Sequence, residues 1–421
     1  EPDEDIYDFS FTDGIVDIAH KYGLKVVWAF FMHTQIDMST KAVMDPADFW
    51  AYHIDDRNGS SYAIQWPKDE DGEIIATVEG LKLKGYEITP CYFNPLVYKH
   101  IVRNSETVLG IQIGNEEGFN YNGSDSDYNP FTCDLLRKWK KTTGSEDIVQ
   151  FKKAAVNKVW RLFSSVFHQY DRYKFTTTNI QEGAEWGKIS VVNRVGMDME
   201  TYRECGVDSI GTMFYEVCGC GRKTFEVMDS LYKDKYATEL PILIPTEIGV
   251  GGGNPKGFFQ EIVINVIERG GQGVSAYCYG ELVDSTLYNI NSDGSLLRNF
   301  SATLKNCEDI ITSGLPGNGN FTFSTTCKRS KISTVSKDNN HVLGILHFPE
   351  DVYDKMPEVI MTVSVNIATC DEGKYIIETY IDGVVKTACW ETIGKGNSSV
   401  DLEIEISNMN AAFIKILPWC D

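Results

Sequence analysis

Two glutamates stand directly after short apolar runs, where carboxylates are most able to do chemistry. Glu116 follows the run 108–115, and Glu247 follows the run 240–246. Apolar runs that stop at a carboxylate, with glycine close behind, are typical of buried parallel strands. In barrel enzymes the carboxyl ends of such strands hold the catalytic groups. Two carboxylates placed in this way predict the acid/base and the nucleophile that cleave a glycosidic bond.

That chemistry sets a demand on geometry. Cleavage with retention of configuration needs two carboxyl groups about 5–5.5 Å apart, one protonated and one ionised. If Glu116 and Glu247 end two strands of one barrel, their side chains converge over its mouth. Carboxyl groups this close separate their pKa values, because both cannot ionise freely. The competing interpretation of Asn115-Glu116 alone is a helix cap.

The elements that must position these glutamates alternate between apolar runs and amphipathic stretches, the pattern of a parallel sheet. Predicted strands end at or near Asn179, Tyr215, Glu247 and Tyr279, which are 36, 32 and 32 residues apart. A (β/α)8 barrel of about 250 residues has roughly 31 residues per unit. The spacing therefore predicts an α/β fold of the TIM-barrel type.

Periodicity also predicts the individual elements. Strands are expected at 24–31, 108–114, 174–178, 207–215, 241–246 and 273–279. Helices are expected at 11–22, 147–170, 258–269 and 296–312. Six strands make an open sheet with two exposed edges, which does not close. We therefore expect the first two β/α units, roughly 60 residues, to precede Glu1 or to come from another segment. The alternative is an open doubly wound sheet, which leaves the two glutamates unexplained.

The pattern changes near residue 314, where a Gly- and Pro-rich stretch predicts a linker over residues 314–320. Strict alternation over 400–406 predicts a half-solvated strand. Asp382-Gly383, between two apolar runs, predicts a hairpin turn. We therefore expect a partial barrel domain over residues 1–313 and an antiparallel β-sandwich over residues 321–421.

Composition restricts the partners. The formal net charge of -21 disfavours nucleic acid, because a phosphate-binding surface needs the opposite sign, whereas a neutral sugar is indifferent to it. The longest apolar run, 26–32, is too short to span a bilayer, so no membrane partner is expected. The 11 scattered cysteines favour free thiols in a reducing cytoplasm over a secreted disulfide framework. A targeting signal upstream of Glu1 is left open.

Four segments together resemble one group of enzymes. They are 1–27, 91–95, 110–116 (Gly-Ile-Gln-Ile-Gly-Asn-Glu) and 244–247 (Ile-Pro-Thr-Glu). These segments resemble clan A glycoside hydrolases, nearest to the β-galactosidase families 42 and then 35. The resemblance covers residues 1–312 and begins after the second strand of the family fold. It therefore agrees with a barrel whose first two units are missing.

The resemblance implies a role for each matching residue. Glu116 would be the general acid/base, and Asn115 would hydrogen-bond the sugar 2-hydroxyl. Glu247 would be the nucleophile, and Tyr215 would hydrogen-bond it. The clan often carries a tryptophan on strand eight, where this chain has tyrosines instead, so the identity of the sugar platform stays open.

Further side chains at strand ends, or in the loops after them, are candidate substrate contacts. They are Asn179, Trp186, Tyr279 and His33, with Trp28, Glu182, Glu185 and Tyr277 beside them. Aromatic rings there can line a sugar site, although rim packing is the more common role of any one of them.

No metal or organic cofactor is expected. Cys218 and Cys220, with Cys205 upstream, lack the second cysteine pair of a structural zinc site. The glycines at 251–253 lack the Lys-Ser/Thr of a phosphate loop.

These patterns predict a retaining β-glycosidase that hydrolyses terminal β-galactosides, with an oligosaccharide or glycoside as its partner. Two alternatives stay open. One is another clan A activity, such as β-glucosidase or β-mannanase, and the other is a non-catalytic carbohydrate-binding protein on a decayed barrel. A homo-oligomer is a further open expectation, since subunit packing often completes such sites.

Overall fold

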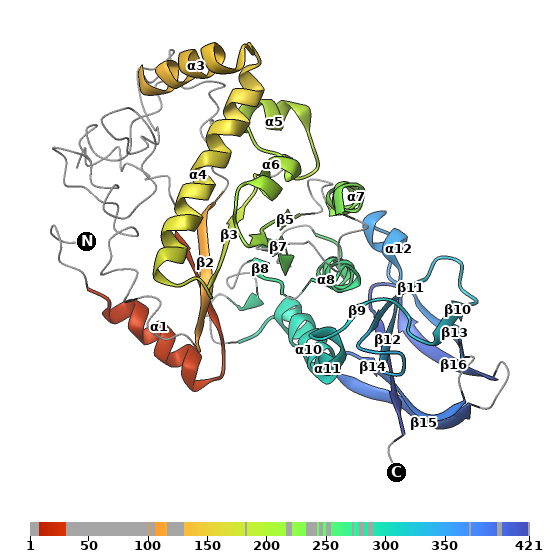
Figure 1. Ribbon diagram of the computed structural model, residues 1–421. Helices are drawn as coiled ribbons and strands as arrows, with labels where there is room; N and C mark the ends of the chain where they lie inside the picture. Colours follow the sequence, from red (N-terminus) through yellow and green to blue (C-terminus); the bar gives the residue numbers. More distant parts are fainter. Residues whose placement is uncertain are drawn as a thin grey trace. The chain divides into compact units, whose positions relative to one another are not determined.

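The computed structural model describes residues 8–30, 100, 106–115, 130–181, 183–215, 221–232, 242–243, 247–249, 254–271, 273–277, 282–284, 289–369, 372–393 and 398–419. By internal contacts the chain divides into two compact units, Glu1–Thr212 and Met213–Asp421. Figure 1 traces the elements in sequence order. In the described part of the chain, no helix combines the length and the apolar character that a bilayer crossing requires.

The first unit contains a parallel sheet with the strand order β1-β2-β3. The strands of this sheet are β1 (Val26–Phe30), β2 (Val108–Asn115) and β3 (Phe175–Asn179). The short strand β4 (Ser209–Ile210) follows later in the same unit. The helices of the first unit are α1 (Ser10–Lys21), α3 (Pro130–Thr143), α4 (Ile148–Tyr170), α5 (Ile189–Val195) and α6 (Met199–Glu204). The predicted strands at 24–31, 108–114 and 174–178 and the predicted helices at 11–22 and 147–170 are confirmed.

Helix α4 shows why the helices of this unit can be predicted from the sequence. Asp147 is its N-cap, and its side chain accepts hydrogen bonds from the backbone N–H groups of Val149 and Gln150 at 2.9 and 3.2 Å. Such a cap satisfies donors that the first turn leaves open. Trp160 and Phe167, seven positions apart on one helix face, are 1% and 0% exposed. One apolar face and one cap therefore define the helix.

The predicted strand 207–215 is broken, because β4 ends at Ile210 and β5 (Met213–Phe214) begins the second unit. Tyr202, 1% exposed, contacts both β3 and β4. Its hydroxyl lies 2.9 Å from the carbonyl of Thr178 and 2.7 Å from that of Ser209, and it accepts from the N–H of Gly211 at 2.8 Å. A side chain thus supplies hydrogen bonds where the strand ladder is interrupted.

The second unit begins with a parallel sheet of order β5-β7-β8. Its remaining elements up to residue 311 are α7 (Gly221–Tyr232), β6 (Ile242–Leu243), β7 (Glu247–Gly249), α8 (Phe258–Glu268), β8 (Ala276–Tyr277), α10 (Ser292–Asn306) and α11 (Glu308–Ile311). The predicted helix 258–269 is confirmed. The predicted helix 296–312 is two helices that meet at Cys307, and the first begins earlier because Asn291 caps it through Gly294 N–H at 2.9 Å.

Two antiparallel sheets complete the second unit, in the orders β10-β13-β16 and β15-β14-β17-β12-β11-β9. Their strands are β9 (Leu315–Pro316), β10 (Phe321–Thr325), β11 (Lys331–Ser336), β12 (Val342–His347), β13 (Ile360–Thr369), β14 (Gly373–Ile381), β15 (Val384–Ile393), β16 (Ser398–Ser407) and β17 (Ala412–Pro418). Helix α12 (Pro349–Tyr353) follows β12. The inner faces of both sheets share one core, to which Val365 and Ile404 contribute from the first sheet and Ile377 and Ile414 from the second.

Two details of these sheets follow directly from the sequence. Asp382 and Gly383 have φ angles of 52° and 79°, the left-handed pair that a two-residue hairpin requires, and they join β14 to β15. In β16 the buried Leu402 and Ile404 alternate with the exposed Glu403, as predicted. The segment predicted as a linker contains β9, which pairs with β11 at Leu315 and Pro316.

Candidate active site

The candidate site is centred on Glu247, which opens β7, and Tyr215, which directly follows β5. The two strands are parallel, with Met213 opposite Glu247 and Phe214 opposite Ile248. Tyr215 therefore continues its strand along β7. Its hydroxyl donates a hydrogen bond to Glu247 Oε2 at 2.6 Å, a length typical of a hydroxyl that donates to a carboxylate. Both side chains are half-buried.

The Tyr215 hydrogen bond has a clear geometric effect. A glutamate side chain has three rotatable bonds, so a carboxylate at a sheet edge needs a second anchor to hold one orientation. Tyr215 supplies that anchor from the neighbouring strand, and β5 supports the tyrosine. The hydrogen bond that the sequence resemblance implies between these residues is therefore present, although Glu247 begins a strand rather than following one.

Gly249 makes room for this arrangement. A Cβ atom at this position would lie 2.8 Å from Cδ1 of Tyr215 and 2.3 Å from Nδ2 of Asn254. Both distances are far below van der Waals contact, so the Tyr215 ring can pack over β7 because residue 249 lacks a side chain. Sequence reasoning missed this residue, and the glycines at 251–253 that it did consider lie outside the described residues.

Tyr277 adds an exposed aromatic ring beside the pair. It ends β8 opposite Gly249 of β7. Its ring centroid lies 6.1 Å from that of Tyr215 with an interplanar angle of 77°, an edge-to-face contact. With 46% of its surface exposed, the ring offers an apolar face to a ligand next to Glu247.

In the first unit, two of the predicted substrate contacts lie at the same edge of one sheet. Asn115 ends β2 and Asn179 ends β3, and the two are register partners. Asn179 is 1% exposed and also bridges in parallel to Gly211. The backbone of Asn115 is described, whereas its side chain is not.

Trp186 lies in the turn after β3. Gly183 and Gly187, with φ angles of 91° and 75°, allow the chain to reverse there. Lys188 Nζ lies 5.8 Å from the Trp186 ring centroid, and the Trp186 side chain is half-buried. Neighbouring Glu185 is fully buried. The predicted aromatic contact thus lies in a turn closed by backbone hydrogen bonds after the carboxyl end of β3.

Several predicted residues lie outside the described part of the chain: Glu116, His33, Tyr279, Glu182, Cys218 and Cys220. The separation between the carboxyl groups of Glu116 and Glu247 therefore stays a prediction. Within the described segments, no group of His, Cys, Asp or Glu side chains is arranged to hold a metal ion.

Comparisons with known proteins bear on the fold. No protein-family model matches this chain, and no curated protein sequence is similar to it. The β-galactosidase of the psychrophilic Marinomonas ef1 matches 76% of this chain and 56% of its own, with a TM-score of 0.50 and 12% identity. The cold-adapted β-galactosidase of Rahnella sp. R3 matches 76% of this chain and 51% of its own, with a TM-score of 0.52 and 13% identity.

At identities this low, the likeness establishes the fold alone. Both solved structures are TIM-barrel glycoside hydrolases. This chain spans about half the length of each. The two structures therefore support the α/β fold of the TIM-barrel type that the 36- and 32-residue spacing predicts.

Proposed function

We propose that this protein is a retaining β-glycosidase that hydrolyses terminal β-galactosides. The hydrogen bond from Tyr215 to Glu247, between two parallel strands of an α/β fold, carries the proposal. A carboxylate anchored in this way can attack along one fixed line. Its partner Tyr215 follows the carboxyl end of β5, and TIM-barrel enzymes keep their chemistry at the carboxyl ends of strands. The two β-galactosidases of similar fold support the choice of galactoside.

The mechanism needs two carboxyl groups with separate roles. Glu247 attacks the anomeric carbon, and the glycosidic bond breaks while Glu116 donates its proton to the leaving oxygen. Glu116 then takes a proton from water, which attacks the same carbon and releases Glu247. Asn115 hydrogen-bonds the sugar 2-hydroxyl, a contact that strengthens in the transition state.

The proposed architecture places this chemistry in a barrel domain over residues 1–313. Residues 321–421 form a β-sandwich domain, and residues 314–320 join the two. Asn179, Trp186, Tyr279 and His33 are proposed substrate contacts, and the exposed ring of Tyr277 is added to them from its place beside Tyr215.

A panel of aryl β-glycosides tests the proposal, with the β-galactoside expected to be the best substrate of the full protein. Glu247→Ala should abolish hydrolysis, and azide should restore cleavage by attacking from the vacated side. Because that attack is a single displacement, the product should be the α-glycosyl azide. In Glu116→Ala, azide should instead attack the covalent intermediate and give the β-glycosyl azide.

The anomer of the azide product separates the two roles. The same anomer from both variants would contradict the assignment of nucleophile and acid/base. Full activity in both variants would remove the pair from catalysis. A folded protein that binds galactosides but hydrolyses no member of the panel would favour the non-catalytic carbohydrate-binding alternative.

A further inference from the structure

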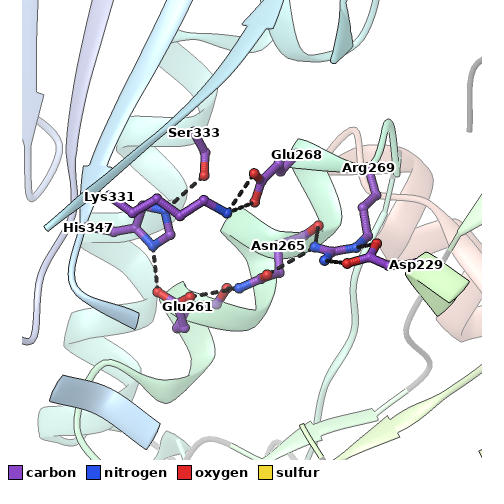
Figure 2. Close-up of polar contacts among 8 residues, drawn as sticks. All are labelled: Asp229, Glu261, Asn265, Glu268, Arg269, Lys331, Ser333 and His347. Carbon is purple, nitrogen blue, oxygen red and sulfur yellow. Dashed lines mark hydrogen bonds and ion pairs between the residues drawn. The ribbon is translucent and has the colours of Figure 1, made fainter. Parts of the chain in front are cut away.

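A chain of buried hydrogen bonds joins helix α8 to strands β11 and β12 of the six-stranded antiparallel sheet (Figure 2). Glu261, on the first turn of α8, and His347, at the end of β12, are each 2% exposed. His347 Nδ1 donates to Glu261 Oε2 at 2.7 Å. The other ring nitrogen, Nε2, lies 2.9 Å from the hydroxyl of Ser333 in β11. Both nitrogens of the imidazole therefore have partners.

A contact of this kind fixes geometry more strictly than apolar packing does. A buried carboxylate is costly unless its hydrogen bonds are made with good geometry. Glu261 meets this condition through two partners, since Asn265 Nδ2 donates to its Oε1 at 2.7 Å. Sliding or rotating α8 against β11 and β12 would break these directional bonds. The pair therefore sets the position of α8 on the sheet.

The same network continues along α8 toward the candidate site. Arg269 Nη1 donates to Asn265 Oδ1 at 2.9 Å, and Arg269 holds Asp229 of α7 through two hydrogen bonds of 2.8 and 2.6 Å. The guanidinium carbon of Arg269 lies 4.5 Å from the ring centroid of Phe225. Phe225 in turn stacks on Phe214 at 4.9 Å. Phe214 directly precedes Tyr215, the partner of Glu247.

Strand β7 pairs with a strand on each side. Among the residues that the structure describes, its register partners are Met213 and Phe214 in β5 and Ala276 and Tyr277 in β8. Helix α8 packs against β7 and also against β11. The helix therefore lies between the strand that carries Glu247 and the sheet that carries His347. A shift of α8 would be transmitted to β7, because the helix packs directly against this strand.

We propose that Glu261 and His347 are positioning residues for Glu247. Through them the six-stranded sheet that contains β11 and β12 holds α8, and α8 holds β7 with the Glu247 carboxylate at its start. This sheet then helps to position the catalytic carboxylate. The catalytic consequence rests on the proposed glycosidase function, whereas the effect on β7 does not.

The test uses the full chain and replaces both partners at once, with Glu261→Met and His347→Leu. Replacing a whole buried pair by apolar residues of similar volume is often neutral for stability. Amide hydrogen exchange at Ile248 and Gly249 measures how often the backbone hydrogen bonds of β7 open. We expect roughly tenfold faster exchange there, while β14 and β17 stay unchanged. On the aryl β-galactoside, kcat should fall roughly ten- to a hundredfold with little change in KM.

Two single variants serve as controls. Glu261→Gln keeps the size of the side chain and its oxygen accepts from Asn265. Its amide N–H can donate to Nδ1 of His347 in the tautomer whose Nε2–H donates to Ser333, so this variant should keep most of kcat and of the exchange protection. Lys331→Met removes the ion pair to Glu268, which joins the same helix to the same sheet at 2.7 Å but is 47% and 26% exposed. An exposed pair contributes little, so this variant should resemble the wild type.

The outcomes separate the two proposals. Wild-type exchange and wild-type kcat in the double variant would overturn the positioning role and leave the pair as a feature of stability alone. If the wild type hydrolyses no glycoside, the proposed function fails, and the exchange at β7 still decides whether the pair positions the strand. If the double variant does not fold, Ser333→Ala takes its place. Exchange at β7 no faster than in Lys331→Met then overturns the proposal.

Discussion

The hydroxyl of Tyr215 donates to Oε2 of Glu247 at 2.6 Å across two parallel strands. The bond joins residues 32 positions apart in the chain. It fixes the orientation of the carboxylate that we propose as the nucleophile, and it gives the first prediction.

Tyr215→Phe should lower kcat/KM on the aryl β-galactoside by about 10- to 100-fold, because hydrogen bonds to charged groups are worth about 1.5–3 kcal/mol. The ring and its packing on Gly249 remain, so the free energy of unfolding should change little. Tyr277→Phe is the matched control, since it removes the hydroxyl of the adjacent ring while keeping the apolar face. Equal kcat/KM in Tyr215→Phe and wild type would contradict a role of the hydroxyl in positioning Glu247.

Gly249→Ala should disturb the site by a different route. The new methyl group would lie 2.8 Å from the Tyr215 ring and 2.3 Å from Asn254, and overpacking of this kind costs about 1–3 kcal/mol. Urea unfolding should show the loss of stability, and kcat should fall with it as the ring is displaced.

The control for Gly249→Ala is Gly14→Ala on α1, where a new Cβ would meet nothing within 4 Å. That change should stabilise the protein by about 0.5–1 kcal/mol, because alanine is the better helix former. A neutral Gly249→Ala would show that β7 can move away from Tyr215 without cost.

Tyr202→Phe should destabilise the first unit by about 1–3 kcal/mol, the cost of leaving buried polar groups without a partner. The variant removes the hydroxyl that serves the backbone of Thr178, Ser209 and Gly211. Tyr173→Phe is the control, since Tyr173 is 83% exposed and such surface changes stay within about 0.5 kcal/mol. Equal urea midpoints for the two variants would show that other groups satisfy this junction.

His168 and Asp208 predict a pH dependence of stability in the first unit. His168 Nε2 lies 2.9 Å from Asp208 Oδ2. The hydrogen bond that His168 donates to Asp208 is the main reason that the pKa of His168 is raised from 6.5. Burial tends to raise the pKa of Asp208, but hydrogen bonds from His168 and Thr176 lower it below 3.8 overall.

The signs of the two shifts define the pH window. The His168 contribution is fully present below its unfolded pKa and is lost as pH rises through the raised folded pKa. The Asp208 contribution is present above its unfolded pKa and is lost as pH falls through the lowered folded pKa. The stability lost in His168→Gln should therefore be largest between about pH 4 and 6.5. A loss that stays constant from pH 4 to 9 would contradict the charged pair.

Much of the fold could be read from local pattern. Asp147 before an apolar helix face predicts a capped α4, and Asp382-Gly383 predicts the β14–β15 hairpin; the structure has both. These features depend on residues a few positions apart, so the information is contained in a short stretch of chain. The strand at 207–215 was wrong as one element, because Tyr202 from a separate helix supplies part of the hydrogen bonding there.

By itself, the sequence determined the alternation of β-strands and α-helices, the change to alternating strands after residue 314, and the choice of Glu247 and Tyr215 as candidate site residues. Tertiary structure alone decided which side chains serve them. Gly249 matters because the Tyr215 ring lies over it, and Glu261 is paired because His347, 86 residues later, is folded against it. Neither partner leaves a periodic signal, since a contact between distant residues depends on how whole elements pack and not on the spacing within one of them.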